Sequence, residues 1–317
     1  MKIAYVILAH KNPHQLIRLV QRLMTDNSLF FIHVDKKASQ SIVDEIEQAL
    51  DRFSNIFFLT RVTCYWGSFG LVEAALQGIR MLIDKELGFD RLILLSAQDY
   101  PIKPLEQLDS FLQINFDKEF IECEDYNIPP DKSIPSSGID RIRYWHFSIG
   151  KNRFVFPAKL ESSVANRSRI KKYKTFKLFS VLWNHLLPYF PIKRKIPSNL
   201  NYFIGSQFWC LTYQSVKYIH EFVEHNPKIV DFFRYTDIPD ESFFQTIIMN
   251  SPFSKQVVNQ NLHYIDWQNP NPLFPRTFIS SDISSLMSSS KFFARKFDTH
   301  KDAEILDLLD KDIILPL

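Results

Sequence analysis

Residues 3–13 read IAYVILAHKNP, a short apolar run followed by a histidine, a lysine and an Asn-Pro pair. Such a run is typical of a strand that is buried on both faces of a sheet. Asn12 and Pro13 then predict a helix start, with Asn12 as the N-cap, because proline fits the first helical position. Apolar residues recur at helical spacing after it, at Leu16, Leu19, Val20 and Leu23. The stretch therefore predicts a strand followed directly by a helix.

The same unit recurs through the first third of the chain. Apolar runs at residues 29–34, 56–59 and 92–95 predict further strands. Helices are predicted near residues 41–53 and over residues 68–84, between those strands. Alternation of strand and helix requires a mostly parallel sheet with helices on both faces. We therefore expect an α/β fold with a mostly parallel central sheet flanked by helices.

The remainder of the chain is less regular. Residues 120–123 and 203–211 predict strands, a helix is expected to start near residues 239–241, and an amphipathic helix near residues 303–309. No internal repeat or low-complexity linker divides the sequence. We expect one compact domain over residues 1–317.

Composition excludes several classes of protein. The chain is 45% hydrophobic and 23% charged, as in ordinary soluble globular proteins. It has only 7 glycines and neither a GxGxxG nor a GxxxxGK[ST] sequence, which argues against a dinucleotide-binding site and a P-loop. A net charge of +3 does not indicate a nucleic-acid binder. Three separated cysteines without a CxxC pair predict no disulfide framework and no zinc site, and they suit a reducing compartment: Cys64, Cys123 and Cys210.

Positive charge is concentrated in one segment. Residues 162–220 contain no Asp or Glu. The segment carries a cluster of basic side chains at Arg167, Arg169, Lys171, Lys172, Lys174, Lys177, Lys193, Arg194 and Lys195. A surface of this kind favours an anionic partner. Two interpretations stay open: a helix lying on an anionic membrane, or a basic surface helix packed on the core by its apolar side.

In open parallel sheets, ligands bind beyond the carboxyl ends of the strands. The residues there are His10, Asp35, Trp66 and the run SAQDYP at 96–101. Each acid also has a plain structural interpretation, since an aspartate after a strand forms turns and a glutamate near a helix start complements the helix dipole. Taken singly, these residue types do not identify a chemistry.

Several short motifs occur along the sequence, and their order is informative. They are FIHVDKK at 31–37, WGSFGLVEAAL at 66–76, LSAQDYPIK at 95–103, GSQFW at 205–209, PDE at 239–241, HYIDW at 263–267, PRTF at 275–278 and FARKFD at 293–298. In sequence, spacing and order they resemble the core-2/I-branching and peptide O-xylosyltransferase family, glycosyltransferase family 14. The match runs from about Ala4 to Asp298, nearly the whole chain.

The resemblance implies a GT-A-like, Rossmann-type fold that binds a nucleotide sugar. The donor half would comprise residues 1–115, and the acceptor and catalytic half residues 116–317, with the basic amphipathic insert near residues 162–197. It also implies that Glu241 is the catalytic base, in the first turn of a helix. A carboxylate is needed because an acceptor hydroxyl is a poor nucleophile until its proton is removed. One base on one face, opposite the leaving group, gives inversion.

The leaving nucleoside diphosphate gains negative charge, which a metal or fixed cations must stabilise. The strand end at residues 96–99 has a single acid and no Asp-x-Asp motif. The resemblance implies that Arg276 and Lys296 take the place of a metal, with Arg295 as the rival of Arg276. No divalent metal cofactor is therefore expected.

Other positions follow from the same resemblance. His10, Asp35, Trp66 and Asp99 would border the nucleotide and the donor sugar. Glu122 and Trp267 would contact the acceptor, and a tryptophan suits this role because its ring stacks on sugar faces.

The animal members have a Golgi membrane anchor and many disulfides, and this sequence shows neither. Its N-terminal apolar run is too short for a signal peptide or an anchor. We expect a cytoplasmic microbial enzyme, peripheral to the inner face of the membrane. It would transfer GlcNAc or xylose from UDP to a glycan or lipid-linked acceptor in surface polysaccharide synthesis. Two alternatives stay open: a metal-dependent enzyme with an ion at Asp99 or Asp35, and a non-catalytic nucleotide-sugar-binding subunit of a polysaccharide assembly complex.

Overall fold

The computed structural model describes residues 1–126, 138–149, 152–156, 194–268 and 274–314. Strands and helices alternate in its first part, as predicted. The elements are β1 (Ile3–Ala9), α1 (Pro13–Leu23), β2 (Ser28–Val34), α2 (Gln40–Leu50), β3 (Ile56–Phe58), α3 (Gly70–Asp84) and β4 (Arg91–Ser96).

The rest of the described chain consists of shorter elements. They are β5 (Asp99–Pro101), α4 (Leu105–Ile114), β6 (Glu119–Ile121), β7 (Glu124–Asp125), α5 (Gly138–Arg143), β8 (Trp145–Ile149), β9 (Asn152–Phe156), β10 (Phe203–Ile204), β11 (Trp209–Thr212), α8 (Tyr213–His225), α9 (Pro227–Arg234), the 3₁₀ turn η2 (Pro239–Glu241), α10 (Phe243–Met249), η3 (Pro252–Gln256), β12 (Val257–Val258), β13 (His263–Ile265), η4 (Ser280–Asp282), α11 (Ile283–Ser288), β14 (Phe293–Arg295) and α12 (Glu304–Ile314).

Within the described residues, the central sheet has seven strands in the order β12-β6-β11-β4-β1-β2-β3. Every pair is parallel except those of β11, which runs antiparallel to β4 and β6. The β3-β2-β1-β4 part has the order of the first four strands of a Rossmann sheet. The predicted α/β, GT-A-like class is therefore confirmed. Because β6, β11 and β12 join this sheet, it draws strands from both predicted halves of the chain.

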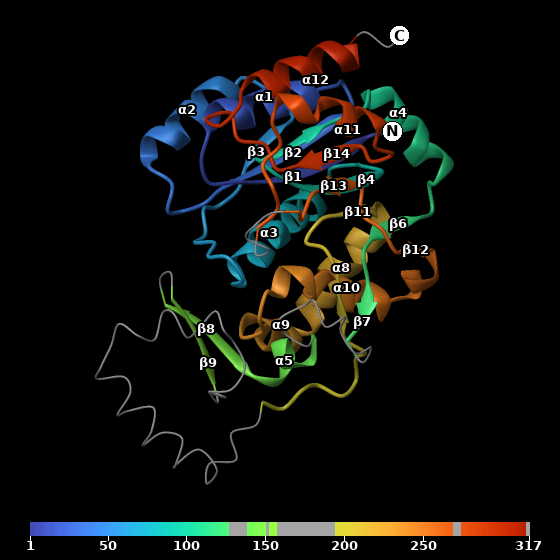
Figure 1. The fold of residues 1–317 in the computed structure, drawn as a ribbon. Coiled ribbons are helices and arrows are strands. Elements are labelled where there is room, and N and C mark those ends of the chain that lie inside the picture. The colour runs from blue at the N-terminus through green and yellow to red at the C-terminus, as the bar shows by residue number, and fades with distance from the viewer. Residues whose placement is uncertain (127–137, 150–151, 157–193, 269–273, 315–317) are drawn as a thin grey trace, which may run out of the picture.

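Strand β1 lies in the middle of the sheet and is buried on both faces. Tyr5 and Ile7 point into the cluster that includes residues of α1, α2 and α12. Ala4 and Val6 point into the other cluster, with residues of α3, α8 and α10. This alternation follows from the two-residue period of a strand. Figure 1 shows the two layers, with α1, α2 and α12 over one face and α3, α8 and α10 on the other.

A second, three-stranded sheet in the order β13-β14-β5 lies beside the first. Strand β14 runs antiparallel to β5, and Arg295 is the register partner of Asp99. The pairing brings the C-terminal FARKFD motif to the strand that follows β4. The site residues after β4 and after β14 therefore lie together.

Three local predictions need correction. The strand expected at residues 203–211 is two separate strands, β10 and β11. The helix expected at Pro239 is a 3₁₀ turn, and α10 begins only at Phe243, because Ile238 lies in the left-handed region at φ 47° just before the turn. The side chain of Asn12 caps no helix; it donates to Asp298 at 2.9 Å, and its backbone is left-handed at φ 52°.

Most of the predicted basic insert lies outside the described residues, and its two interpretations stay open. Arg194 is described, and it is not a surface cation. The residue is 5% exposed, its guanidinium lies 3.8 Å from the centre of the Phe232 ring, and Nη1 contacts the Ile142 carbonyl oxygen at 3.2 Å and the Thr236 hydroxyl at 3.2 Å. Its aromatic and carbonyl neighbours explain the burial. Among the described helices, none is both long and apolar enough to cross a bilayer.

Replacing Arg194 with Ala is expected to lower the free energy of unfolding by about 2–3 kcal/mol, because buried carbonyl and hydroxyl acceptors lose their donor. Urea unfolding measures the change. Lys195→Ala is the matched control, since Lys195 is exposed and should change stability by less than about 0.5 kcal/mol. Equal, small effects for both variants would contradict the structural role given to Arg194.

Candidate active site

A group of basic side chains gathers where β1 and β14 end. His10 follows β1, and Arg295 and Lys296 lie at the end of β14. Desolvation lowers the pKa of His10, and the nearby charges of Lys11 and Arg295 lower it as well. These predicted donor-site residues are therefore within electrostatic reach of one another.

Lys296 is the cation of this group whose charge is not matched. Lys11 pairs with Asp298 at 2.6 Å, and Arg295 Nε lies 3.2 Å from Asp99 Oδ1. Among the described residues, no carboxylate forms an ion pair with Lys296. Burial lowers the pKa of Lys296, and the neighbouring Arg295 and Lys11 lower it further, while Asp298 opposes the shift. Like charges held together in this way favour binding of an anion.

Asp99 is fully buried, and its carboxylate is occupied by protein groups. Oδ2 accepts from the Ser96 backbone N–H at 2.7 Å, and Oδ1 from the Ser96 hydroxyl at 2.7 Å. Burial alone would raise the pKa of Asp99, but Arg295 and His263 beside it hold the pKa below its ordinary value. The structure thus gives Asp99 the role of positioning Arg295, and a direct contact with the donor stays a prediction.

Asp35 follows β2 and is 4% exposed. Its carboxylate accepts from the Lys37 backbone N–H at 2.9 Å and from Lys37 Nζ at 2.7 Å. This is the turn-forming arrangement that an aspartate after a strand often adopts. Asp35 also influences the pKa of His10, so it lies at the same sheet edge.

Trp66 lies on the loop after β3, with 50% of its surface exposed. The Arg153 guanidinium lies 4.7 Å from its ring centre, and the Phe274 ring 6.3 Å away. The carbonyl of Gly67 accepts from the backbone N–H of Ile238 at 3.3 Å. The loop therefore contacts the segment that carries the predicted base.

Arg276 is already bound to two carboxylates. Its Nε donates to Asp266 at 2.8 Å, and Nη1 and Nη2 donate to Asp282 at 2.8 and 3.0 Å. These bonds raise the pKa of Arg276 above its ordinary value. The positive charge of Arg276 is compensated within the protein, unlike that of Lys296.

The predicted base lies on the turn η2, one residue before the N-cap of α10. The Glu241 side chain is 31% exposed, and Arg141 Nη1 donates to its Oε2 at 2.8 Å. Of the residues that the structure describes, none donates to Oε1. The turn therefore presents one carboxylate oxygen fixed by an arginine and one oxygen available to a ligand.

Gly205 joins this turn to the predicted acceptor residue Glu122. Its N–H donates to the Glu241 carbonyl at 2.8 Å, and a Cβ at this position would lie 1.8 Å from the Glu122 carbonyl oxygen. Only glycine allows the two segments to approach so closely. Burial raises the pKa of Glu122, and the nearby Glu241 raises it as well. The two glutamates predicted for acceptor and catalysis therefore lie together.

Trp267 follows β13, with 55% of its surface exposed. Its ring is therefore available for stacking, and its role stays a prediction.

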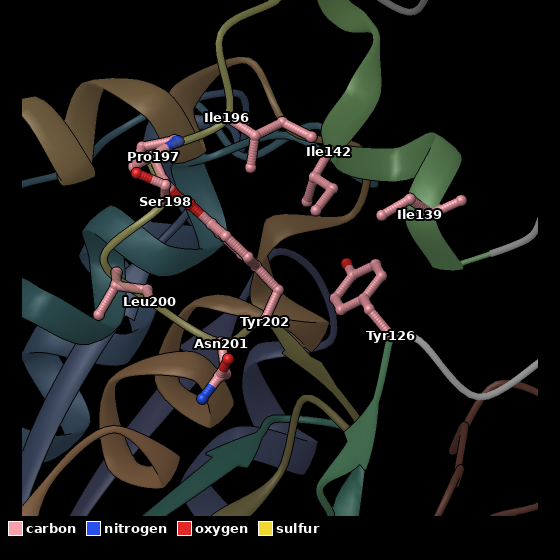
Figure 2. A pocket seen from close by; sticks show the side chains of 9 residues that line it. All are labelled: Tyr126, Ile139, Ile142, Ile196, Pro197, Ser198, Leu200, Asn201 and Tyr202. Carbon is pink, nitrogen blue, oxygen red and sulfur yellow. Dashed lines mark hydrogen bonds between the residues drawn. The ribbon is translucent and has the colours of Figure 1, made fainter.

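A cavity of about 300 Å³ lies in the second half of the chain, away from Trp267 in sequence. Figure 2 shows that it lies between the end of β7, helix α5 and the segment 196–202. Its lining is mostly apolar, and one wall is Tyr126, whose pKa burial raises to about 12, with Glu241 contributing. Through Tyr126 the cavity adjoins the turn η2 and the residue after it.

Sequence reasoning missed Arg141, Arg153 and Asp240. The two arginines lie in the irregular middle of the chain, where no pattern indicated a site. Asp240 belongs to the PDE motif that the sequence analysis identified, but the sequence did not predict that its side chain is buried. The described residues contain no group of three or more His, Cys, Asp or Glu arranged to hold a metal ion.

Comparisons with known proteins bear on this arrangement. The model of the family described as "Core-2/I-Branching enzyme" matches residues 3–133 and 132–287. Xylosyltransferase 2 of Rattus norvegicus is 28% identical over 334 residues, which covers 98% of this chain and 33% of the rat protein. Xylosyltransferase 1 of Homo sapiens is 26% identical over 332 residues, which covers 98% of this chain and 30% of the human protein. The chain thus spans about a third of the length of these relatives. Among solved structures, the mannosyltransferase Ktr4p from S. cerevisiae matches with a TM-score of 0.32 and 10% identity, over 76% of this chain and 65% of that one.

Proposed function

The chain belongs to the Core-2/I-branching enzyme family, and we propose that it is an inverting glycosyltransferase. It moves a sugar from a UDP-sugar to a hydroxyl of a glycan or lipid-linked acceptor. The observation that carries the proposal is an outward carboxylate on the turn η2 together with Lys296, a cation for which no described carboxylate forms an ion pair. Arg141 holds Glu241, and the adjacent Asp240 interacts with Arg295, the neighbour of Lys296.

The transfer is a single displacement. The acceptor oxygen attacks the anomeric carbon of the sugar, and Glu241 takes the hydroxyl proton as the new C–O bond forms. The bond between the anomeric carbon and the phosphate oxygen breaks, and its electron pair leaves with UDP. The Arg141 hydrogen bond to Oε2 fixes the carboxylate, so that Oε1 faces the acceptor hydroxyl. Attack from the face opposite UDP inverts the anomeric configuration.

The departing diphosphate is stabilised by fixed cations. Lys296 is the first of these, because its charge has no carboxylate partner among the described residues and its like-charged neighbours favour an anion. Arg295 lies beside it and interacts with His10. The guanidinium nitrogens of Arg276 already donate to Asp266 and Asp282. Arg276 is therefore expected to stabilise the diphosphate less than Lys296 does. Since these charges and the absence of an Asp-x-Asp motif fit a metal-free reaction, we propose that transfer needs no divalent ion.

The donor sugar, the acceptor contacts and the cellular location are further parts of the proposal. The relatives are named xylosyltransferases, which supports UDP-xylose as the first donor to test, with UDP-GlcNAc as the second. Glu122 and Trp267 are proposed to contact the acceptor. We also propose that the enzyme works in the cytoplasm, against the inner face of a membrane, in surface polysaccharide synthesis. The segment that would carry that contact, residues 162–197, lies mostly outside the described residues.

Glu241→Gln is expected to lower the transfer rate by about 10²–10⁴-fold, because the amide cannot accept the proton. The amide oxygen can still accept from Arg141, so the fold and UDP binding should be unchanged. Donor screening with UDP-, GDP- and CMP-sugars identifies the assay substrate, and product formation measures the rate. Glu224→Gln, at an exposed position of α8, is the control. Undiminished turnover in Glu241→Gln would mean that the base is misassigned, and a wild type without turnover would favour the non-catalytic alternative.

Lys296→Ala is expected to raise the Kd for UDP about tenfold or more, because a charge-assisted contact to phosphate is lost. Arg276→Ala should raise it less, since its charge is compensated in the free protein. Calorimetry with UDP, in EDTA and in Mn²⁺, compares the two variants with the wild type. The assignment fails if Lys296→Ala binds UDP as well as the wild type does, or if EDTA abolishes wild-type binding.

A further inference from the structure

The turn η2 places two adjacent carboxyl groups in opposite environments. Asp240 is 7% exposed, whereas the Glu241 side chain is 31% exposed. The cause is the backbone: Ile238 is left-handed at φ 47°, and Pro239 then starts a 3₁₀ turn. Asp240 therefore points inward, beneath the catalytic carboxylate.

The charges around Asp240 are paired with other groups. Arg141 donates to Glu241, and Arg295 lies 3.2 Å from Asp99. Arg153 forms an ion pair with Asp237. Asp240 is the carboxyl of this cluster for which the described residues supply no ion pair and no hydrogen bond to Oδ1.

An unpaired carboxylate is costly to bury. Burial raises the pKa of Asp240 to about 7, and the charge of Glu241 contributes to the rise. A buried polar atom without a partner calls for a physical reason, and a ligand that donates to the Asp240 carboxyl supplies one.

The position of Asp240 points to the donor. Arg295, at the end of β14, interacts with it from the diphosphate side. Cys64, on the loop after β3, interacts with it from the carboxyl edge of the sheet. Glu122, which is predicted to contact the acceptor, interacts instead with the outward Glu241. Asp240 therefore lies within electrostatic reach of residues that we assign to the donor side.

The chemistry of the site favours a hydroxyl. Three arginines already surround the carboxyl and oppose a cationic ligand: Arg141, Arg153 and Arg295. The negative charge of Asp240 opposes a phosphate. A neutral sugar hydroxyl donates to a carboxylate without either penalty, and the hydrogen bond is strong because it is charge-assisted.

We propose that Asp240 binds a ring hydroxyl of the donor sugar and so determines which nucleotide sugar the enzyme accepts. The inference rests on the proposed function, since it requires a UDP-sugar in this site. Asp240 is then a specificity-determining residue next to the base, distinct from the cations that bind the diphosphate.

The test compares Asp240→Asn and Asp240→Ala with the wild type, using UDP-xylose, UDP-GlcNAc and UDP alone as ligands in calorimetry. The donor that the wild type prefers should bind about tenfold more weakly to both variants, while the Kd for UDP changes less than about twofold. Removing the contacted hydroxyl from the donor should weaken binding to the wild type by a similar factor and leave Asp240→Ala unaffected. Melting temperatures show that the variants fold.

Equal changes in the Kd for UDP and for the UDP-sugar would overturn the proposal, because they would show a merely structural role. No change in either Kd would overturn it too. Asp231→Asn, at an exposed position of α9, should leave both constants unchanged. Failure of the wild type to bind any UDP-sugar would instead reject the proposed function itself. Loss of transfer in Glu241→Gln, together with normal donor selection in the Asp240 variants, would reject only the role of Asp240.

Discussion

Arg295 faces Asp99 across adjacent antiparallel strands, and the geometry of the site depends on this buried pair. The Asp99 side chain is fully buried, and that of Arg295 is 18% exposed. Removing either partner would leave an uncompensated charge away from water, which is strongly destabilising. The pair therefore fixes β14 against the strand that follows β4. With β14 in place, the charge of Lys296 interacts with those of Arg295 and of Lys11, which follows β1.

The remaining site geometry follows from local backbone features, namely a residue with a left-handed backbone and a glycine. Ile238, whose backbone is left-handed, and Pro239 after it leave the first carboxyl of the turn, that of Asp240, buried and the next, that of Glu241, outward. Gly205 allows the turn to approach the segment that carries Glu122. Tight turns thus hold the carboxyl groups of Glu241 and Asp240, and the sheet that contains β14 holds Arg295 and Lys296. Positioning of this kind is what a displacement between two bound substrates requires.

The core of the fold could be predicted from the sequence, since apolar runs such as the one before His10 alternate with segments whose apolar residues recur at helical spacing. The order of motifs led to the choice of Glu241 and Lys296, whose roles stay predictions. The predictions failed where long-range contacts decide, as in Arg194, whose burial depends on carbonyl and aromatic neighbours distant in the sequence. For Arg276, spacing alone does not reveal the acids that pair with its guanidinium, and its role at the diphosphate stays a prediction. Asp240 shows a third case, because which of two adjacent acids turns inward is set by a dihedral angle rather than by residue type.

The central claim is that side-chain cations at the sheet edge stabilise the departing diphosphate while Glu241 activates the acceptor. A crystal structure with UDP, grown in Mn²⁺, tests this claim most directly. The account predicts Lys296 Nζ within hydrogen-bond distance of a phosphate oxygen, Glu241 facing the space beyond the β-phosphate, and no ion bound to the phosphates. A Mn²⁺ ion bridging the two phosphates, or a Glu241 carboxylate remote from them, would contradict it.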